Sequence, residues 1–150
     1  MTLDQYPIAS DYSHLTYEFE SIGPKGIIRK IVQYQPVGSI TKNLYNLSFG
    51  DLNKVTGEID DTVISNNGDT QKILLTVARS ALEFSTKLTN AHILIAGSTR
   101  SRTRLYQMAF KQHFDEIDKL FDIQGYIEYD WKKFESGINY EAFLLAKKNK

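Results

Sequence analysis

Apolar and polar residues alternate along much of the first 65 residues, which is the period of a strand with one buried face. In the first such segment Leu15, Tyr17 and Phe19 alternate with polar residues, and a Gly23-Pro24-Lys25-Gly26 turn follows it. The pattern predicts four strands, over residues 12–21, 27–37, 44–49 and 57–65. Because the connections between them are short, we expect an antiparallel meander.

A period of 3.6 residues replaces the alternation in two later segments, which predict long amphipathic helices over residues 70–88 and 99–121. A short apolar run at 91–96 indicates a buried strand between them. Two more strands are predicted at 123–129 and 140–146, separated by a loop that contains Trp131, Lys132, Lys133 and Gly137. The order ββββαβαββ predicts an α+β fold, in which two long helices pack on an antiparallel sheet made of the N-terminal meander plus the later strands.

The 150 residues show no break in composition, so we expect a single domain over residues 1–150. Cysteine is absent and the start has no basic segment followed by an apolar run, so we expect a cytoplasmic protein. No apolar run approaches the roughly 20 residues of a membrane helix, which argues against membrane insertion. The net charge is zero, but residues 1–69 carry five Lys/Arg against nine Asp/Glu, and residues 70–150 carry thirteen against nine. This asymmetry is compatible with a polyanionic ligand and equally with two halves that neutralise each other.

Three arginines, Arg100, Arg102 and Arg104, occupy the first turns of the second predicted helix. A helix N-terminus carries about half a positive charge, so each nearby cation is disfavoured by roughly 0.3 to 1 kcal/mol. No carboxylate lies within residues 91–111, so compensation must come from distant carboxylates or from an external anion. The Gly97-Ser98-Thr99 turn favours an anion, because backbone N–H groups and hydroxyls can approach a phosphate there. We therefore predict an anion-binding site at Ser98, Thr99, Arg100, Arg102 and Arg104.

A helical projection separates the arginines of this cluster. One exposed stripe holds Arg100, Arg104, Gln107 and Lys111, whereas Arg102 turns towards the apolar side near Tyr106. Arg102 is then the residue expected to be buried or to form the site. The alternative is that Arg102 pairs internally with an acidic residue of the 51–61 region while the other arginines are solvated.

Other polar residues offer weaker chemistry. His113 lies in the apolar arc of the second helix, where it is either a general base or a hydrogen-bonded core residue. Four acids, Asp51, Glu58, Asp60 and Asp61, cluster near the fourth strand, but adjacent strand residues point to opposite faces and make poor joint ligands. We therefore predict no metal site and no cofactor. The candidate accessory residues are Tyr106, Lys111, His113 and Asp51.

The chain is rich in tyrosine, with nine residues of this type. Half-buried strands favour tyrosine, so packing explains most of them. If several were exposed together, they would stack nucleic-acid bases. The strand tyrosines concerned are Tyr17, Tyr34, Tyr45, Tyr126, Tyr129 and Tyr140.

Three segments carry a resemblance to a known family. They are Val32-Gln-Tyr-Gln-Pro-Val, Phe49-Gly-Asp-Leu with the following Thr56-Gly-Glu-Ile-Asp-Asp-Thr-Val-Ile-Ser-Asn-Asn-Gly-Asp, and Gly97-Ser-Thr-Arg-Ser-Arg-Thr-Arg-Leu-Tyr-Gln-Met. Over most of its length the chain resembles an uncharacterised family of small bacterial proteins, a domain of unknown function with no assigned activity. More loosely, a meander followed by a helix is similar to half of the Whirly and Pur-type single-strand binders, but this chain continues without repeating that unit.

Three functional hypotheses follow. The first is a non-enzymatic module that binds phosphate-bearing ligands, nucleic acid above all, through the start of the second helix. The second is an enzyme acting on a nucleotide or RNA phosphodiester, with Arg102 stabilising charge and His113 or Asp51 as acid or base. The third is a protein-interaction domain whose arginines form internal salt bridges or dock an acidic partner.

Overall fold

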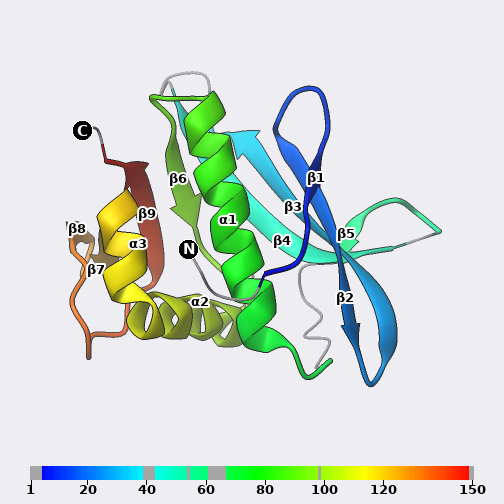
Figure 1. Ribbon diagram of the computed structural model, residues 1–150. Coiled ribbons are helices and arrows are strands. Elements are labelled where there is room, and N and C mark those ends of the chain that lie inside the picture. Colours follow the sequence, from blue (N-terminus) through cyan, green and yellow to red (C-terminus); the bar gives the residue numbers. More distant parts are fainter. Residues whose placement is uncertain (1–4, 39–42, 54, 61–66, 98, 149–150) are drawn as a thin grey trace.

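The computed structural model describes residues 5–38, 43–53, 55–60, 67–97 and 99–148 (Figure 1). Within these ranges nine strands form one sheet and three helices accompany it. The strands are β1 (Ala9–Ser10), β2 (Thr16–Gly23), β3 (Gly26–Pro36), β4 (Leu44–Leu52), β5 (Ile59–Asp60), β6 (His92–Ile95), β7 (Phe121–Ile127), β8 (Asp130–Lys133) and β9 (Ala142–Lys147). The helices are α1 (Thr70–Lys87), α2 (Arg100–Gln112) and α3 (Phe114–Leu120). The α+β class is confirmed, with a larger sheet and a different number of helices than predicted.

The strand order in the sheet is β1-β2-β3-β4-β6-β9-β7-β8, with β5 paired to β4. The strands β2, β3 and β4 form an antiparallel meander, in which Tyr17 lies opposite Val32 and Tyr34 opposite Leu47. β6 runs parallel to β4 and next to it, because α1 carries the chain back over the sheet between them. The other strand pairs are antiparallel.

Two sequence predictions about strands need correction. The strand predicted over 57–65 is described only as the two-residue β5, and residues 61–65 lie outside the described part of the chain. β8 occupies a segment that we predicted to be a loop. Its four residues are all exposed, so they show no alternation of buried and exposed positions that would mark a strand.

The helix predicted over 99–121 is also wrong in its extent, because it breaks at His113 into α2 and α3 (Figure 1). His113 has φ −116° and ψ 25°, outside the helical range, although its N–H still donates to Ala109 and its carbonyl accepts from Ile117. Phe121 then enters β7 directly. The apolar spacing continues through the break, so a projection does not detect it. Asp115 and Glu116 just after it are the acids typical of a new helix N-terminus.

The core lies between the helices and one face of the sheet, and aromatic rings fill much of it. Phe84 of α1 stacks on Tyr34 of β3 with their ring centroids 4.1 Å apart. Phe110 of α2 contacts Phe143 of β9 at 4.9 Å. Each fully buried ring of this size contributes roughly 2 to 3 kcal/mol through the apolar surface that it removes from water.

The start of α1 is fixed by a polar cluster around Tyr6 and Asp69. The Tyr6 N–H donates to the Thr76 hydroxyl at 2.9 Å, and the Tyr6 hydroxyl donates to the Asp69 carboxylate at 2.5 Å. The Ser21 hydroxyl donates to the same carboxylate oxygen at 2.6 Å. Burial, and then the hydrogen bond to Asp69, raise the pKa of Tyr6. These bonds attach the N-terminal segment and β2 to the N-cap and the second turn of α1.

Two buried core tyrosines should respond differently to removal of the hydroxyl. The Tyr34 hydroxyl bonds the Ser80 hydroxyl at 2.8 Å, whereas the buried Tyr17 hydroxyl has no hydrogen-bond partner among the described residues. We expect Tyr34→Phe to lower the free energy of unfolding by about 1 kcal/mol and Tyr17→Phe to leave it unchanged or raise it. Urea unfolding of the two variants measures this difference, and an equal loss in both would contradict it.

The same two tyrosines should make the fold sensitive to alkali. Burial raises the pKa of Tyr17 to about 12 and raises the pKa of Tyr34 as well, whereas the unfolded chain releases these protons near pH 10. Because the folded state then holds more protons, its stability is full below pH 10 and falls as the pH rises towards 12. Urea midpoints across this range should fall less steeply in a Tyr17→Phe, Tyr34→Phe double variant, and parallel curves would refute the assignment.

Candidate functional site

The chain leaves β6 and enters α2 through a tight turn. Thr99 is the N-cap of α2, and its hydroxyl accepts from the Arg102 N–H at 3.2 Å. The Gly97 N–H donates to the Thr103 hydroxyl at 3.1 Å. A Cβ at Gly97 would lie 2.4 Å from the backbone nitrogen of Thr103, so this close approach requires glycine. Gly97 and Thr99 are thus both held against the first turn of α2.

Arg102 points into the protein and is 5% exposed. Its guanidinium donates to the Phe49 carbonyl at 3.3 Å and lies 5.5 Å from the centroid of the Phe49 ring. β6 pairs with β4 only as far as Leu47, and β5 begins to pair at Asp51, so Phe49 lies in the gap between these two neighbours of β4. The Arg102 side chain therefore joins α2 to β4 where strand pairing is interrupted.

A second buried cation lies near Arg102. Lys30 of β3 is 4% exposed, forms a salt bridge with Asp51 and lies 6.0 Å from the Phe49 ring centroid. The Phe49 ring is thus in contact range of both cations, Lys30 and Arg102. Asp51, a predicted accessory residue, is held by Lys30 in this cluster.

Arg104 is half-buried, although we predicted it on an exposed stripe. Its guanidinium donates to the Tyr140 carbonyl at 3.1 Å and to the Gln107 side chain at 3.2 Å. The Gln107 amide in turn donates to the Ile138 carbonyl and accepts from the Tyr140 N–H. The helical projection correctly placed Arg104 and Gln107 on one stripe of the helix. It could not show that segment 138–140 covers this part of the stripe. Arg104 and Gln107 therefore attach α2 to the segment before β9.

The remaining predicted site residues fall into three groups. Thr99, Arg100 and Lys111 are exposed along α2. Tyr106 is buried and packs in the core. Ser98 lies outside the described residues.

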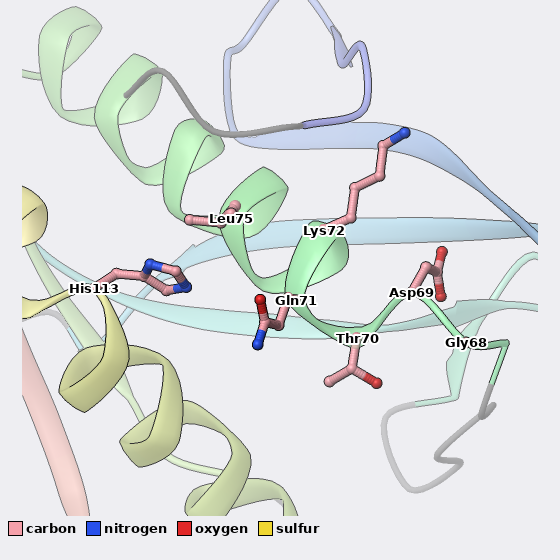
Figure 2. A pocket seen from close by; sticks show the side chains of 7 residues that line it. All are labelled: Gly68, Asp69, Thr70, Gln71, Lys72, Leu75 and His113. Carbon is pink, nitrogen blue, oxygen red and sulfur yellow. The ribbon is translucent and has the colours of Figure 1, made fainter.

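His113 lies far from the arginine-rich turn, next to an open pocket of about 720 Å³ at the start of α1 (Figure 2). Gly68, Asp69, Thr70, Gln71, Lys72, Leu75 and His113 line it. Figure 2 shows His113 and Gln71 pointing towards each other, while Asp69 and Lys72 extend on the other side of α1. Asp69 accepts a hydrogen bond from Tyr6, and the Lys72 ammonium lies 4.2 Å from the Tyr6 ring centroid. These two charges therefore contribute to the polar cluster that fixes α1.

Of the groups proposed for an enzyme, Asp51 lies in the Phe49 cluster near Arg102 but is paired with Lys30, whereas His113 is not brought near Arg102. Arg102 and His113 lie near opposite ends of α2, about 16 Å apart along the helix axis. Such a separation exceeds the reach of two side chains that act on one bond. Within the described ranges, no group of three or more His, Asp or Glu side chains is arranged to hold a metal ion.

Three of the six strand tyrosines are buried in the interior, and Tyr45 is half-buried against the core. Tyr17, Tyr34 and Tyr140 are buried. Tyr126 and Tyr129 lie in and beside the β7–β8 hairpin, where Tyr129 is 94% exposed. The exposed Trp131 also lies in this hairpin, in a segment that we predicted to be a loop.

The comparisons with known proteins identify a family and no activity. The model of a family of unknown function (DUF6934) matches residues 2–148. This match confirms the resemblance to an uncharacterised family. No curated protein and no solved structure matches the chain. Among the described helices, none has the length and apolar character needed to cross a bilayer.

The two arginines of the turn, Arg100 and Arg102, should differ sharply in their contribution to stability. We expect Arg102→Ala to lower the free energy of unfolding by about 2 to 4 kcal/mol, because it removes buried contacts with Phe49. Arg100→Ala, at an exposed position, should change it by less than about 0.5 kcal/mol. Chemical denaturation of both variants tests this, and a tolerant Arg102→Ala would show that the buried guanidinium is dispensable.

Proposed function

The chain belongs to this family of unknown function, and from its geometry we propose that it is a non-enzymatic module that binds phosphate-bearing ligands, nucleic acid among them. The proposed site is the start of α2, with Thr99 and Arg100 facing the ligand; Ser98, which we also predicted for this site, lies outside the described residues. Arg102 and Arg104 support this site from within the protein by holding α2 against β4 and segment 138–140.

The observation that carries the proposal is the start of α2, where two exposed residues open a first turn that holds no acidic residue. The Thr99 hydroxyl already accepts the N–H of Arg102. The N–H groups of Arg100 and Ser101, at the first two positions of the helix, have no intrahelical acceptor. Arg100 and Ser101 are both exposed. A phosphate placed there would accept these N–H groups, interact favourably with the helix dipole and pair with the Arg100 guanidinium.

Two other functions receive less support. An enzyme would need its acid or base near Arg102, but His113 lies about 16 Å along the helix and Asp51 is paired with Lys30. A protein-interaction domain is the second candidate, because Arg102 and Arg104 bond carbonyl groups of the protein itself. A protein-interaction domain of this kind does not explain why Arg100 is exposed at the start of α2.

The proposal predicts salt-sensitive binding that depends on Arg100. Fluorescence anisotropy with a labelled oligonucleotide should give an affinity that falls as salt is raised, since phosphate contacts release counterions. Arg100→Ala should weaken binding roughly tenfold, the loss of about one charge-assisted contact. Arg79→Ala, which removes another exposed arginine from α1, is the matched control and should bind like the parent protein.

A competition experiment distinguishes a site for small phosphate ligands from a site for a polynucleotide. Displacement of the oligonucleotide by inorganic phosphate or a mononucleotide at modest excess would indicate a small-ligand site, and resistance to both would indicate a polynucleotide. Binding that is undetectable at tens of micromolar protein, or indifferent to salt, would overturn the proposed function.

A further inference from the structure

The turn that joins β7 to β8 carries an exposed aromatic side chain at a position with a positive φ angle, where glycine is the usual residue. Glu128 and Tyr129 are its two residues, and their φ angles are +52° and +60°. Two-residue hairpin turns with positive φ at both positions favour Asn-Gly, because other side chains are strained there. Tyr129 is nevertheless 94% exposed, so the strain is not compensated by burial of its ring. Strain of this kind at an exposed side chain is typical of functional segments.

Trp131 adds a second exposed ring on β8, on the face of the sheet opposite α2. It lies opposite Tyr126 in the β7–β8 ladder, and the two rings contact each other with centroids 5.1 Å apart. Trp131 is 36% exposed, on the edge strand of the described sheet. Lys132 and Lys133 follow and are exposed. The hairpin thus combines exposed rings with cations.

The hairpin lies at the same end of the sheet as the start of α2. The strand register shows this. Ile95 of β6 pairs with Phe143 of β9, and Phe143 pairs with Gly125 of β7 on its other side. Gly125 in turn pairs with Lys132 of β8. β6 and β7 both run antiparallel to β9, so the turn after β7 and the turn after β6 emerge in the same direction. Three strand spacings separate β6 from β8, or about 14 Å. A nucleic-acid strand that passes from Arg100 around the hairpin tip to Trp131 must span more than this distance, and so more than about four nucleotides at a spacing of roughly 3.4 Å.

We propose that the ligand of this protein is a single-stranded oligonucleotide whose bases stack on Tyr129 and Trp131 while its phosphates lie at Arg100. This inference rests on the proposed function and adds the class of ligand. Stacking is needed because Glu128 and Glu141 lie at this end of the sheet and offset the attraction of Lys132 and Lys133 for a polyanion. The Asp130 carboxylate is engaged locally, since it accepts the Trp131 N–H at 2.8 Å. A duplex keeps its bases paired inside, so its affinity for exposed rings is lower.

The single tryptophan of the chain makes the test direct, because the intrinsic tryptophan fluorescence reports only on Trp131. The probes are an oligothymidylate of about 12 nucleotides and an abasic strand of the same length. We expect the oligothymidylate to quench Trp131 fluorescence and to bind roughly tenfold more tightly than the abasic strand. The abasic strand should bind through its phosphates and leave the fluorescence unchanged.

A pair of tyrosine variants localises the stacking. Tyr129→Asn removes the ring while keeping a residue that adopts positive φ readily, so the hairpin should still form. It should weaken oligothymidylate binding roughly five- to tenfold and leave abasic binding unchanged. Tyr12→Asn is the matched control, because Tyr12 is equally exposed but lies before β2, at the opposite end of the sheet.

The outcomes distinguish this inference from the proposed function. Equal, Arg100-dependent binding of both strands with unchanged Trp131 fluorescence would overturn base stacking and leave the phosphate site in place. Absence of binding to either strand would overturn both. Tighter binding to a duplex than to the oligothymidylate would also refute the single-stranded ligand.

Discussion

Two strands, β6 and β5, pair with successive parts of one edge of β4 and leave an unpaired gap between them. The rest of the structure depends on the side chain that closes this gap. β3 covers one edge of β4, while β6 and β5 cover successive parts of the other and leave Phe49 between them. A backbone carbonyl in such a gap costs free energy unless a donor reaches it. Arg102 supplies that donor from α2. One side chain thereby satisfies the strand carbonyl and fixes α2 to β4.

This arrangement explains how three arginines coexist at a helix start where positive charge is unfavourable. Arg102 and Arg104 carry their charges away from the helix terminus, one to the Phe49 carbonyl and ring and the other to the Tyr140 carbonyl. Each carbonyl presents the negative end of a dipole, which offsets the repulsion from the helix. Arg100 remains at the surface beside the first-turn N–H groups. The anion-binding role that we propose therefore concerns Arg100, with the other two as its structural support.

Prediction from the sequence is most accurate where a single period governs a whole element. Alternating apolar positions predicted β2, through Tyr17 and Phe19, and β3, through Tyr34. The helical period predicted α1 to within one residue at its C-terminal end. Prediction failed at His113, where the apolar spacing continues although the backbone leaves the helix. It failed again at β8, whose exposed residues have no burial pattern because the strand lies at the edge of the described sheet.

For the candidate site the division is similar. The sequence by itself determined that a glycine turn and an uncompensated cluster of arginines follow a buried strand, and that Arg102 lies on the inward side of its helix, because these follow from residue types and helical geometry. Only the tertiary structure decided that Arg102 bonds the Phe49 carbonyl, that Arg104 is engaged by segment 138–140, and that the β7–β8 turn emerges beside the same end of the sheet. The reason is physical: each of these contacts joins residues more than 25 positions apart, and strand order sets such contacts while local periodicity carries no record of it.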